Sequence, residues 1–232
     1  MLPTAALAAD AAARRFVAAA SNAISARGEF VVALAGGATP RSMYARLAAE
    51  PLASMVEWSK IQVLWGDERC VPPIDAASNY RMARDVLLDH VPVPAANVHR
   101  IRGEDDPAEA AAAYEREMRR IDLVLLGLGE DGHTASLFPG AVPAQDDPRL
   151  VIATRAPIAP VRRVTLTPVA INAAAEVAFL VSGTAKASIV GRVLEGSRRP
   201  RELPAQLIVP ASGRVVWFLD AMAAAELRGG QG

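Results

Sequence analysis

Residues 122–139 read Asp122-Leu-Val-Leu-Leu-Gly-Leu-Gly-Glu-Asp-Gly-His-Thr-Ala-Ser-Leu-Phe-Pro139, so that an apolar run passes directly into a glycine-rich loop. The run from Leu123 to Leu126 is typical of a buried strand, and the loop presents Asp131 and His133. In an open α/β sheet, ligands bind at the carboxyl ends of the strands. His133 is one of three histidines, and histidine has the ordinary pKa closest to neutral pH. This segment is therefore the first candidate for an active site.

The composition is that of a globular domain. The 232 residues, 52% of them hydrophobic, suffice for a large core, and we expect residues 1–232 to form one α/β domain. The formal net charge of zero favours neither a nucleic-acid nor an anionic membrane partner. The single cysteine, Cys70, favours a reducing compartment, and no apolar run approaches the roughly 20 residues of a membrane span. Because residues 1–30 are typical of a helix rather than a signal peptide, we expect a cytoplasmic protein.

Apolar runs and helix-start signals alternate along the chain. Thr39-Pro40, Asp106-Pro107 and Thr167-Pro168 each place a capping side chain before a proline, which is favoured at the first helical position. The alternation predicts a mostly parallel sheet covered by helices on both faces. Strands are expected at residues 30–35, 61–65, 97–100, 123–126, 150–154, 163–166, 177–181 and 214–219, and helices at residues 5–27, from 39, 79–88, 106–120, from 167, from 184 and 221–227.

Two glycine loops stand at expected helix starts. The first, Gly36-Gly-Ala-Thr-Pro-Arg41, links a strand to a helix, where free backbone amides bind anions. From this loop alone, an ordinary tight turn between strand and helix is an equally good interpretation. The second loop, Ser182-Gly-Thr184, is followed by Lys186. Two such loops and a basic side chain together suit a phosphate group.

A charged triplet, Asp67-Glu68-Arg69, follows the expected strand at residues 61–65. Such adjacent opposite charges are compatible with a solvated turn. In a functional site, Arg69 would instead be a fixed cation whose planar donors suit a carbonyl or carboxylate. Cys70 beside Arg69 is a nucleophile candidate if its pKa is lowered. No spacing of histidine with cysteine or carboxylate indicates a metal site, so we expect no metal.

The segment Gly127-Leu-Gly-Glu-Asp-Gly132 matches the dinucleotide fingerprint GxGxxG. That fingerprint requires a long helix after the third glycine and an acidic residue about 20 positions further on. Pro139 leaves little room for the helix. The glycines are better interpreted as a close turn that lets backbone amides approach a ligand and directs His133 outward. The alternative is that His133 only caps or packs against the loop.

Four motif regions occur in the order found in the 6-phosphogluconolactonase family, which this chain resembles over nearly its whole length. The resemblance implies a Rossmann-like three-layer α/β/α fold shared with glucosamine-6-phosphate deaminase and ribose-5-phosphate isomerase. It also implies hydrolysis of 6-phospho-D-glucono-1,5-lactone, in the oxidative branch of the pentose phosphate pathway, by a monomer without a cofactor. The matching segments are Leu34–Pro40, Trp65–Pro72 with Ser78–Tyr80, Gly127–Pro139 and Ser182–Lys186.

The resemblance also implies roles for individual residues. His133 falls on the proposed general base, and Asp131 is placed to orient it or to shape the loop. Arg69 falls on the arginine that contacts the sugar ring or the developing charge, with Asp67 nearby. The residues implied in substrate and phosphate binding are Gly36, Gly37, Ala38, Thr39, Arg41, Gly129 and Lys186.

Two alternatives remain beside the lactonase. Glucosamine-6-phosphate deaminase has a similar loop, but with a glutamate where this chain has Phe138 and a tyrosine where it has Arg69. Isomerisation needs that extra acid–base group, whereas one base suits hydrolysis. A non-catalytic sugar-phosphate sensor would need a DNA-binding element, and the alanine-rich residues 1–30 offer no basic face for one.

Overall fold

The computed structural model describes residues 1–144 and 146–228. Five parallel strands form a central sheet in the order β2-β1-β4-β7-β8. Every residue of β1, β4 and β7 is buried, the pattern of strands covered on both faces. The strands are β1 Phe30–Leu34, β2 Ile61–Trp65, β4 Leu123–Leu126, β7 Glu176–Val181 and β8 Arg214–Leu219.

The strand order reverses between β1 and β4. Strand β1 pairs in parallel with β2 on one side and with β4 on the other. In open α/β sheets the ligand crevice lies at such a reversal, beyond the carboxyl ends of the strands. The loops that begin at Gly36 and Gly127 follow these two strands, so the topology brings them together at one edge of the sheet.

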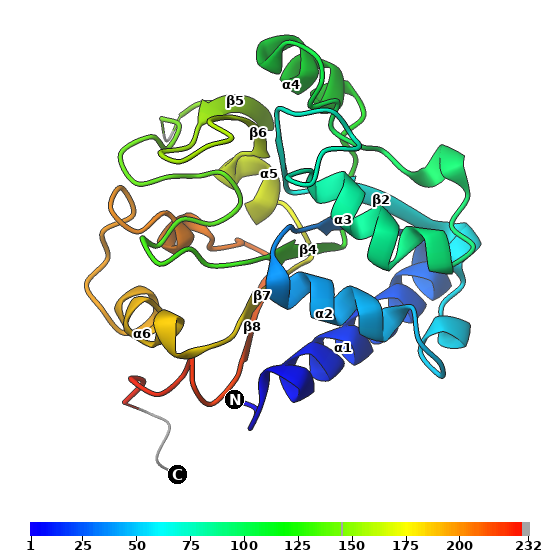
Figure 1. Cartoon of the computed structure of the whole chain (residues 1–232), viewed down its shortest axis with the longest axis horizontal. Coiled ribbons are helices and arrows are strands. Elements are labelled where there is room, and N and C mark those ends of the chain that lie inside the picture. The colour runs from blue at the N-terminus through cyan, green and yellow to red at the C-terminus, as the bar shows by residue number, and fades with distance from the viewer. Residues whose placement is uncertain (145, 229–232) are drawn as a thin grey trace.

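Helices cover both faces of the sheet. Figure 1 shows α1 (Ala5–Arg27) and α2 (Ala38–Leu47) on one side of the central strands, with α5 (Pro168–Asn172) and α6 (Ala187–Leu194) on the other. This is the expected three-layer α/β/α arrangement. In the described part of the chain, no helix is both long and apolar enough to cross a bilayer. The remaining helices are α3 Asn79–Val86 and α4 Pro107–Arg116, and the 3-10 turns are Ala53–Met55, Trp58–Lys60, Leu88–His90, Ala95–Asn97, Thr184–Lys186 and Pro204–Leu207.

A second, antiparallel sheet lies beside the first. Its strands, in the order β3-β6-β5, are β3 Asp67–Arg69, β6 Arg162–Leu166 and β5 Val151–Arg155. Gly66 joins the two sheets, because its N–H donates to Leu34 O (2.8 Å) and its carbonyl accepts from Leu166 N (2.8 Å). The alternation of the sequence located β5 and β6 but did not predict that they pair with β3 outside the parallel sheet.

Local signals explain most helix starts. Ser78, Asp106 and Thr167 cap their helices, each accepting a hydrogen bond from a first-turn N–H. The expected cap at Thr39 is wrong: α2 starts at Ala38 with Gly37 before it. The Thr39 hydroxyl lies 2.9 Å from Ser182 Oγ, so it joins two loops rather than capping one helix.

Three other expectations fail for physical reasons. Residues 97–100 form no strand, since Val98 makes only an isolated bridge to Val63. Residues 221–227 form turns instead of a helix, and a single stretch this short gains little from alanine propensity alone. Helix α4 ends at Arg116, short of residue 120, because Asp122 N already donates to Val31 O (2.9 Å) at the sheet.

Candidate active site

A pocket of about 440 Å³ opens at the carboxyl ends of β1, β4 and β7. The two glycine loops, the segment after β2 and the loop after β4 all contribute to its wall. The fold therefore assembles, from distant parts of the sequence, the segments in which the candidate residues were found. The lining includes Gly36, Gly37, Ala38, Thr39, Asp67, Arg69, Asn79, Gly129, His133, Ser182 and Lys186.

The loop after β4 folds back on itself. Gly129 N donates to His133 O (2.8 Å), and Gly132 N donates to Gly129 O (3.0 Å). Gly132 has φ of +86°, a conformation that glycine adopts without strain. A Cβ on Gly129 would lie 2.0 Å from His133 Nδ1. Gly129 is thus glycine because the imidazole lies directly over it.

His133 and Asp131 form a pair at the pocket rim. His133 Nδ1 lies 2.6 Å from Asp131 Oδ1, and the histidine side chain is 34% exposed. Partial burial raises the pKa of the Asp131 carboxyl. The backbone N–H, the charge and the ring of His133 lower it by more, so the pKa of Asp131 lies below its ordinary value. A carboxylate at this position favours the proton on Nδ1 and leaves Nε2 able to accept one.

Asp67 is a buried carboxylate between two neutral donors. It is 8% exposed, and its Oδ2 accepts from Ser136 Oγ (2.6 Å) while its Oδ1 accepts from Asn79 Nδ2 (3.2 Å). A Cβ on Gly36 would lie 1.9 Å from Asn79 Oδ1, so Gly36 leaves space for this amide. Sequence reasoning did not assign roles to Ser136 and Asn79, although both lie within the motif segments.

Glu68 organises the segment that follows β3. This side chain is 2% exposed, and it accepts the N–H groups of Arg69, Asn79 and Tyr80 as well as the Ser78 hydroxyl. Burial raises the pKa of Glu68, although these donors oppose the shift. Sequence reasoning missed this role. The signal available in the sequence was the position of Glu68 between the two candidate residues Asp67 and Arg69.

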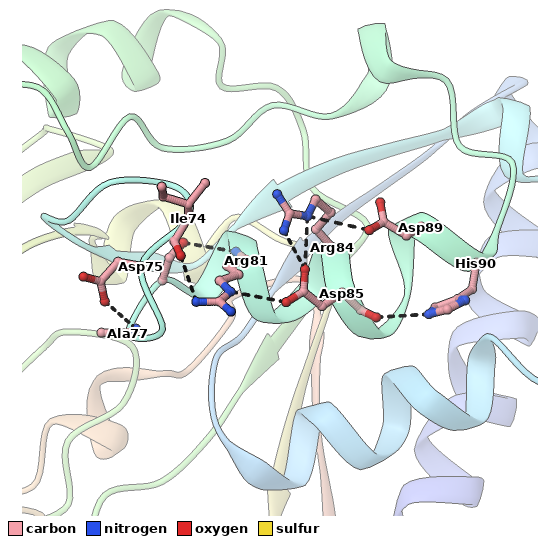
Figure 2. A network of polar contacts seen from close by, with 9 residues as sticks. Ile74, Asp75, Ala77, Arg81, Arg84, Asp85, Asp89 and His90 are labelled. Atoms are coloured by element: carbon pink, nitrogen blue, oxygen red, sulfur yellow. Dashed lines mark hydrogen bonds and ion pairs between the residues drawn. The ribbon is translucent and has the colours of Figure 1, made fainter.

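The Arg69 guanidinium is aimed by a loop. Its Nη1 donates to the carbonyl of Ala77, and its Nε is buried with no partner in the described part of the chain. Figure 2 shows how the loop is held: Arg81 reaches back from α3 to Ile74 O (2.8 Å), and Asp75 Oδ1 accepts from Ala77 N (2.7 Å). Arg69 therefore keeps donors available while its position is fixed.

The two expected phosphate loops lie side by side. Besides the Thr39–Ser182 hydroxyl contact (2.9 Å), Gly183 N donates to the buried carboxylate of Asp220 (3.1 Å). Lys186 lines the pocket, and its Nζ lies 3.8 Å from Glu130 Oε1. Arg41 is exposed and lies outside the lining. The structure therefore does not bring Arg41 into this pocket lining, and its role in phosphate binding stays a prediction.

Comparison with known proteins decides the family. The family model described as "Glucosamine-6-phosphate isomerases/6-phosphogluconolactonase" matches residues 3–217. This chain belongs to that family. A 6-phosphogluconolactonase from a Nostoc species is 41% identical over 218 residues, which cover 89% of this chain and 88% of the relative.

Solved structures support the same family at the level of fold. The Trypanosoma brucei 6-phosphogluconolactonase structure is 31% identical, with a TM-score of 0.85 over 98% of this chain and 97% of that chain. A monomeric glucosamine-6-phosphate deaminase is 23% identical, with a TM-score of 0.82 over 97% of each chain. That second likeness concerns the fold alone, so the two branches of the family must be separated by their site residues.

Phe138 distinguishes this family member from the deaminase pattern. Its ring packs beside His133, with the ring centroids 4.9 Å apart. The position therefore supplies an apolar wall to the imidazole and no second acid–base group. In this family member, His133 is the histidine that lines the pocket, whereas His90 bonds to Asp85 O and His99 to Gln62 outside it.

Cys70 does not have the environment of a nucleophile. Burial raises the pKa of its thiol, and the nearby charges of Arg162 and Arg163 offset this only in part. The sequence-based suggestion of a lowered pKa is therefore wrong. No cluster of three or more histidine, cysteine or acidic side chains suited to a metal ion occurs within residues 1–144 and 146–228.

Proposed function

We propose that this chain hydrolyses 6-phospho-D-glucono-1,5-lactone to 6-phospho-D-gluconate, with His133 as the general base. The observation that carries the proposal is a pocket lined by His133, Arg69 and Lys186, with Asp131 paired to His133 at its rim. The pocket offers one base, one fixed cation near it and a basic loop region. These are the groups that hydrolysis of a phosphorylated lactone needs.

The chemistry suits a single base. A δ-lactone is an activated ester, so a water molecule can attack its carbonyl carbon without a covalent enzyme intermediate. His133 Nε2 accepts the proton of that water, a contribution of typically about 10²–10⁴-fold. Arg69 stabilises the tetrahedral oxyanion. The ring C–O bond then breaks, and the imidazolium returns its proton to the leaving ring oxygen. The carboxylic acid formed at C1 loses its remaining proton to solvent and becomes the carboxylate.

The phosphate occupies the other end of the substrate. Backbone amides of residues 37–39 at the start of α2 and the ammonium of Lys186 are the groups that hold it. Gly36 and Gly129 make room for Asn79 and His133, so they shape the site. Binding energy gained at the phosphate places the lactone carbonyl against the water, and therefore contributes to the rate as well as to affinity.

Asp67 acts in this scheme as a positioning residue. Its two carboxylate oxygens already accept from Ser136 and Asn79, so it fixes these groups at the pocket wall and does not take the proton of water. We also propose that the chain works in the cytosol as a monomer and without a cofactor. Size-exclusion chromatography and an assay in the presence of a chelator test the last two points.

The deciding experiment measures 6-phosphogluconate formation from freshly generated lactone against the spontaneous rate, with glucosamine-6-phosphate deamination run in parallel. Acceleration without ammonia release supports the lactonase, and no acceleration contradicts it. His133→Ala is expected to lower kcat by about 10²–10⁴-fold with little change in KM. The exposed His90 provides the control variant His90→Ala, which should keep full activity.

Lys186 provides a separate test of the phosphate end. Lys186→Ala is expected to raise KM for the phosphorylated lactone by about tenfold, the scale of one hydrogen bond to a charged group. KM for unphosphorylated gluconolactone should change little, so the preference between the two lactones should shrink. The exposed Lys60 gives the control Lys60→Ala. An unchanged preference in Lys186→Ala would remove the phosphate role.

A further inference from the structure

A second hollow, of about 480 Å³, adjoins the pocket on the far side of His133. It shares Asp67, Arg69, His133 and Lys186 with the main pocket and continues to Arg163, a residue that none of the motifs contains. We call this hollow the side pocket. Because the His133 ring lines both spaces, a substrate whose phosphate lies at the glycine loops can extend past the base toward Arg163.

Arg163 and Arg69 lie next to each other because strands β3 and β6 pair in the second sheet. In the β3–β6 register, Arg69 is directly opposite Arg163. Side chains at directly opposite positions project to the same face of an antiparallel pair, and like charges there are unfavourable. Arg163 is 9% exposed. Burial and the charge of Arg69 lower the pKa of Arg163.

Neither guanidinium has an ionic partner among the described residues. The Nε of Arg163 donates to Pro160 O (2.8 Å), which is a neutral acceptor, and the Nε of Arg69 is buried without one. A buried and a partly buried cation therefore lie side by side. The nearby charges of Asp67 and Glu68 raise the pKa of Arg163 in part, but neither carboxylate forms an ion pair with it.

The carboxylates of the side pocket are already engaged. Asp67 accepts from Ser136 and Asn79, Asp131 pairs with His133, and Glu130 faces Lys186. A buried cation that has no ion-pair partner is costly, and a bound anion lowers that cost. The arrangement thus fits a planar anion that accepts from two guanidinium forks at once.

We propose that Arg163, together with Arg69, binds the carboxylate formed at C1 of the product and, before it, the oxyanion of the tetrahedral intermediate. This inference rests on the function proposed above. The phosphate is held by the glycine loops, which line the main pocket alone, and by Lys186, which lines both spaces. A second anionic group is therefore what remains for the Arg163 end of the side pocket. Arg163 therefore discriminates between the neutral lactone and the charged states that follow it.

The test compares two ligands that differ only at C1. 6-Phosphogluconate carries a carboxylate there, and glucitol 6-phosphate carries a hydroxymethyl group. In calorimetric titrations, Arg163→Met should weaken 6-phosphogluconate by about 10- to 100-fold, the scale of hydrogen bonds to a charged group, and leave glucitol 6-phosphate nearly unchanged. Arg162→Met is the matched control, because Arg162 is the neighbouring residue of β6, is exposed and lies outside both pockets.

Equal weakening of the two ligands in Arg163→Met, or no weakening of either, overturns the proposal. Thermal unfolding accompanies the titration. The variant should keep its Tm, since removing the buried Arg163 relieves its repulsion with the partly exposed Arg69 opposite to it. Arg163→Lys retains the charge without the planar fork and should recover only part of the affinity for 6-phosphogluconate. Wild-type affinity in Arg163→Lys contradicts the bidentate contact even if Arg163→Met does not fold.

Measurements of lactonase activity and of product inhibition by 6-phosphogluconate test this inference separately from the proposed function. Wild-type protein without lactonase activity contradicts the function, whatever Arg163 does. Active wild-type protein whose product inhibition by 6-phosphogluconate is equally strong in Arg163→Met supports the function and overturns the inference. Weaker product inhibition and a lower kcat in Arg163→Met, with both unchanged in Arg162→Met, support the two together.

Discussion

The loop after β4 and the strand β3 contribute opposite kinds of group to one pocket, and they are built in opposite ways. The loop is local: His133 takes its partner Asp131 from two residues away and lies over Gly129. Strand β3 is non-local: Arg69 is placed by pairing with β6 and by the carbonyl of Ala77. The base therefore takes its ionic partner from within one short segment, although Gly132 O in the same loop also accepts from the distant Ala205 N (3.0 Å). The position of Arg69 depends on the tertiary structure throughout.

One hydroxyl couples the two regions. Ser136 follows the loop after β4 and donates to Asp67 of β3 (2.6 Å). Changes inside the loop should therefore affect chemistry while leaving the fold intact. Changes at the coupling contact should affect stability first.

The largest effect on the local loop is expected from Gly129→Ala, which places a methyl group under the His133 imidazole. In Gly129→Ala, the added Cβ would lie 2.0 Å from His133 Nδ1 and 2.6 Å from Asp131 Oδ1, so the ring must move. We expect kcat to fall nearly as far as in His133→Ala, by about 10²-fold or more, with a Tm close to wild type. Gly191→Ala is the control, because a Cβ there makes only ordinary contacts, at 3.7 Å and beyond, and Gly191 lies outside both pockets. A Gly129→Ala enzyme with normal kcat would show that the ring position is unimportant.

The next largest effect is expected from Asp131→Asn, which keeps the shape of the loop and removes its charge. Asparagine does not fix the proton on Nδ1, and we expect kcat to fall by about 10²-fold, less than the roughly 10⁴-fold typical of a fully buried carboxylate–histidine pair. Steady-state kinetics at several pH values measure this. Unchanged kcat would mean that Asp131 only shapes the backbone turn.

The effect of Asp131→Asn on thermal stability is expected to depend on pH. Because the folded pKa of Asp131 lies below its ordinary value of 3.8, its carboxylate stabilises the fold above that pH, and this contribution is lost as the pH falls through the lowered pKa. The Tm difference between wild type and Asp131→Asn should therefore be largest near neutral pH and shrink in acid. Exposure of the pair keeps the difference small. A gap that widens in acid would contradict the direction of the shift.

The smallest effect on kcat is expected at the Ser136–Asp67 hydrogen bond, which couples the loop after β4 to strand β3. Ser136→Ala leaves the buried Oδ2 of Asp67 without its donor, which should cost about 1–3 kcal/mol of unfolding free energy. We expect a lower Tm and a smaller loss of kcat than in the loop variants. Ser42→Ala is the matched control, since its hydroxyl is exposed and bonds only within α2; urea titration of both variants measures the difference. If Ser136→Ala lost activity without losing stability, the two regions would not be coupled as described.

The same division between local and non-local structure explains what could be predicted from sequence. Strands β4 and β8 were located residue for residue, because apolar runs and flanking glycines are local signals. The turn that carries His133 was readable for the same reason. The Asp131–His133 contact (2.6 Å) has the two-residue spacing that the motif displays.

The residues that were not found depend on partners far along the chain. Arg163 gains its position from pairing with Arg69, and Ser136 from reaching Asp67. No spacing rule links such pairs in one sequence. The expected helix at residues 221–227 fails for a related reason, since its alanines favour a helix locally while the chain forms turns after β8.

The pairing of β3 with β6 also sets an order of events during synthesis. The described β3 residues make their strand pairing with β6 alone, and β6 leaves the ribosome long after β3 and the loop after β4 have emerged. Until then, the backbone of Asp67–Arg69 is an unpaired edge of the kind that associates with other chains. A nascent chain that stops before Arg162 therefore has no strand to complete the cationic side of the pocket.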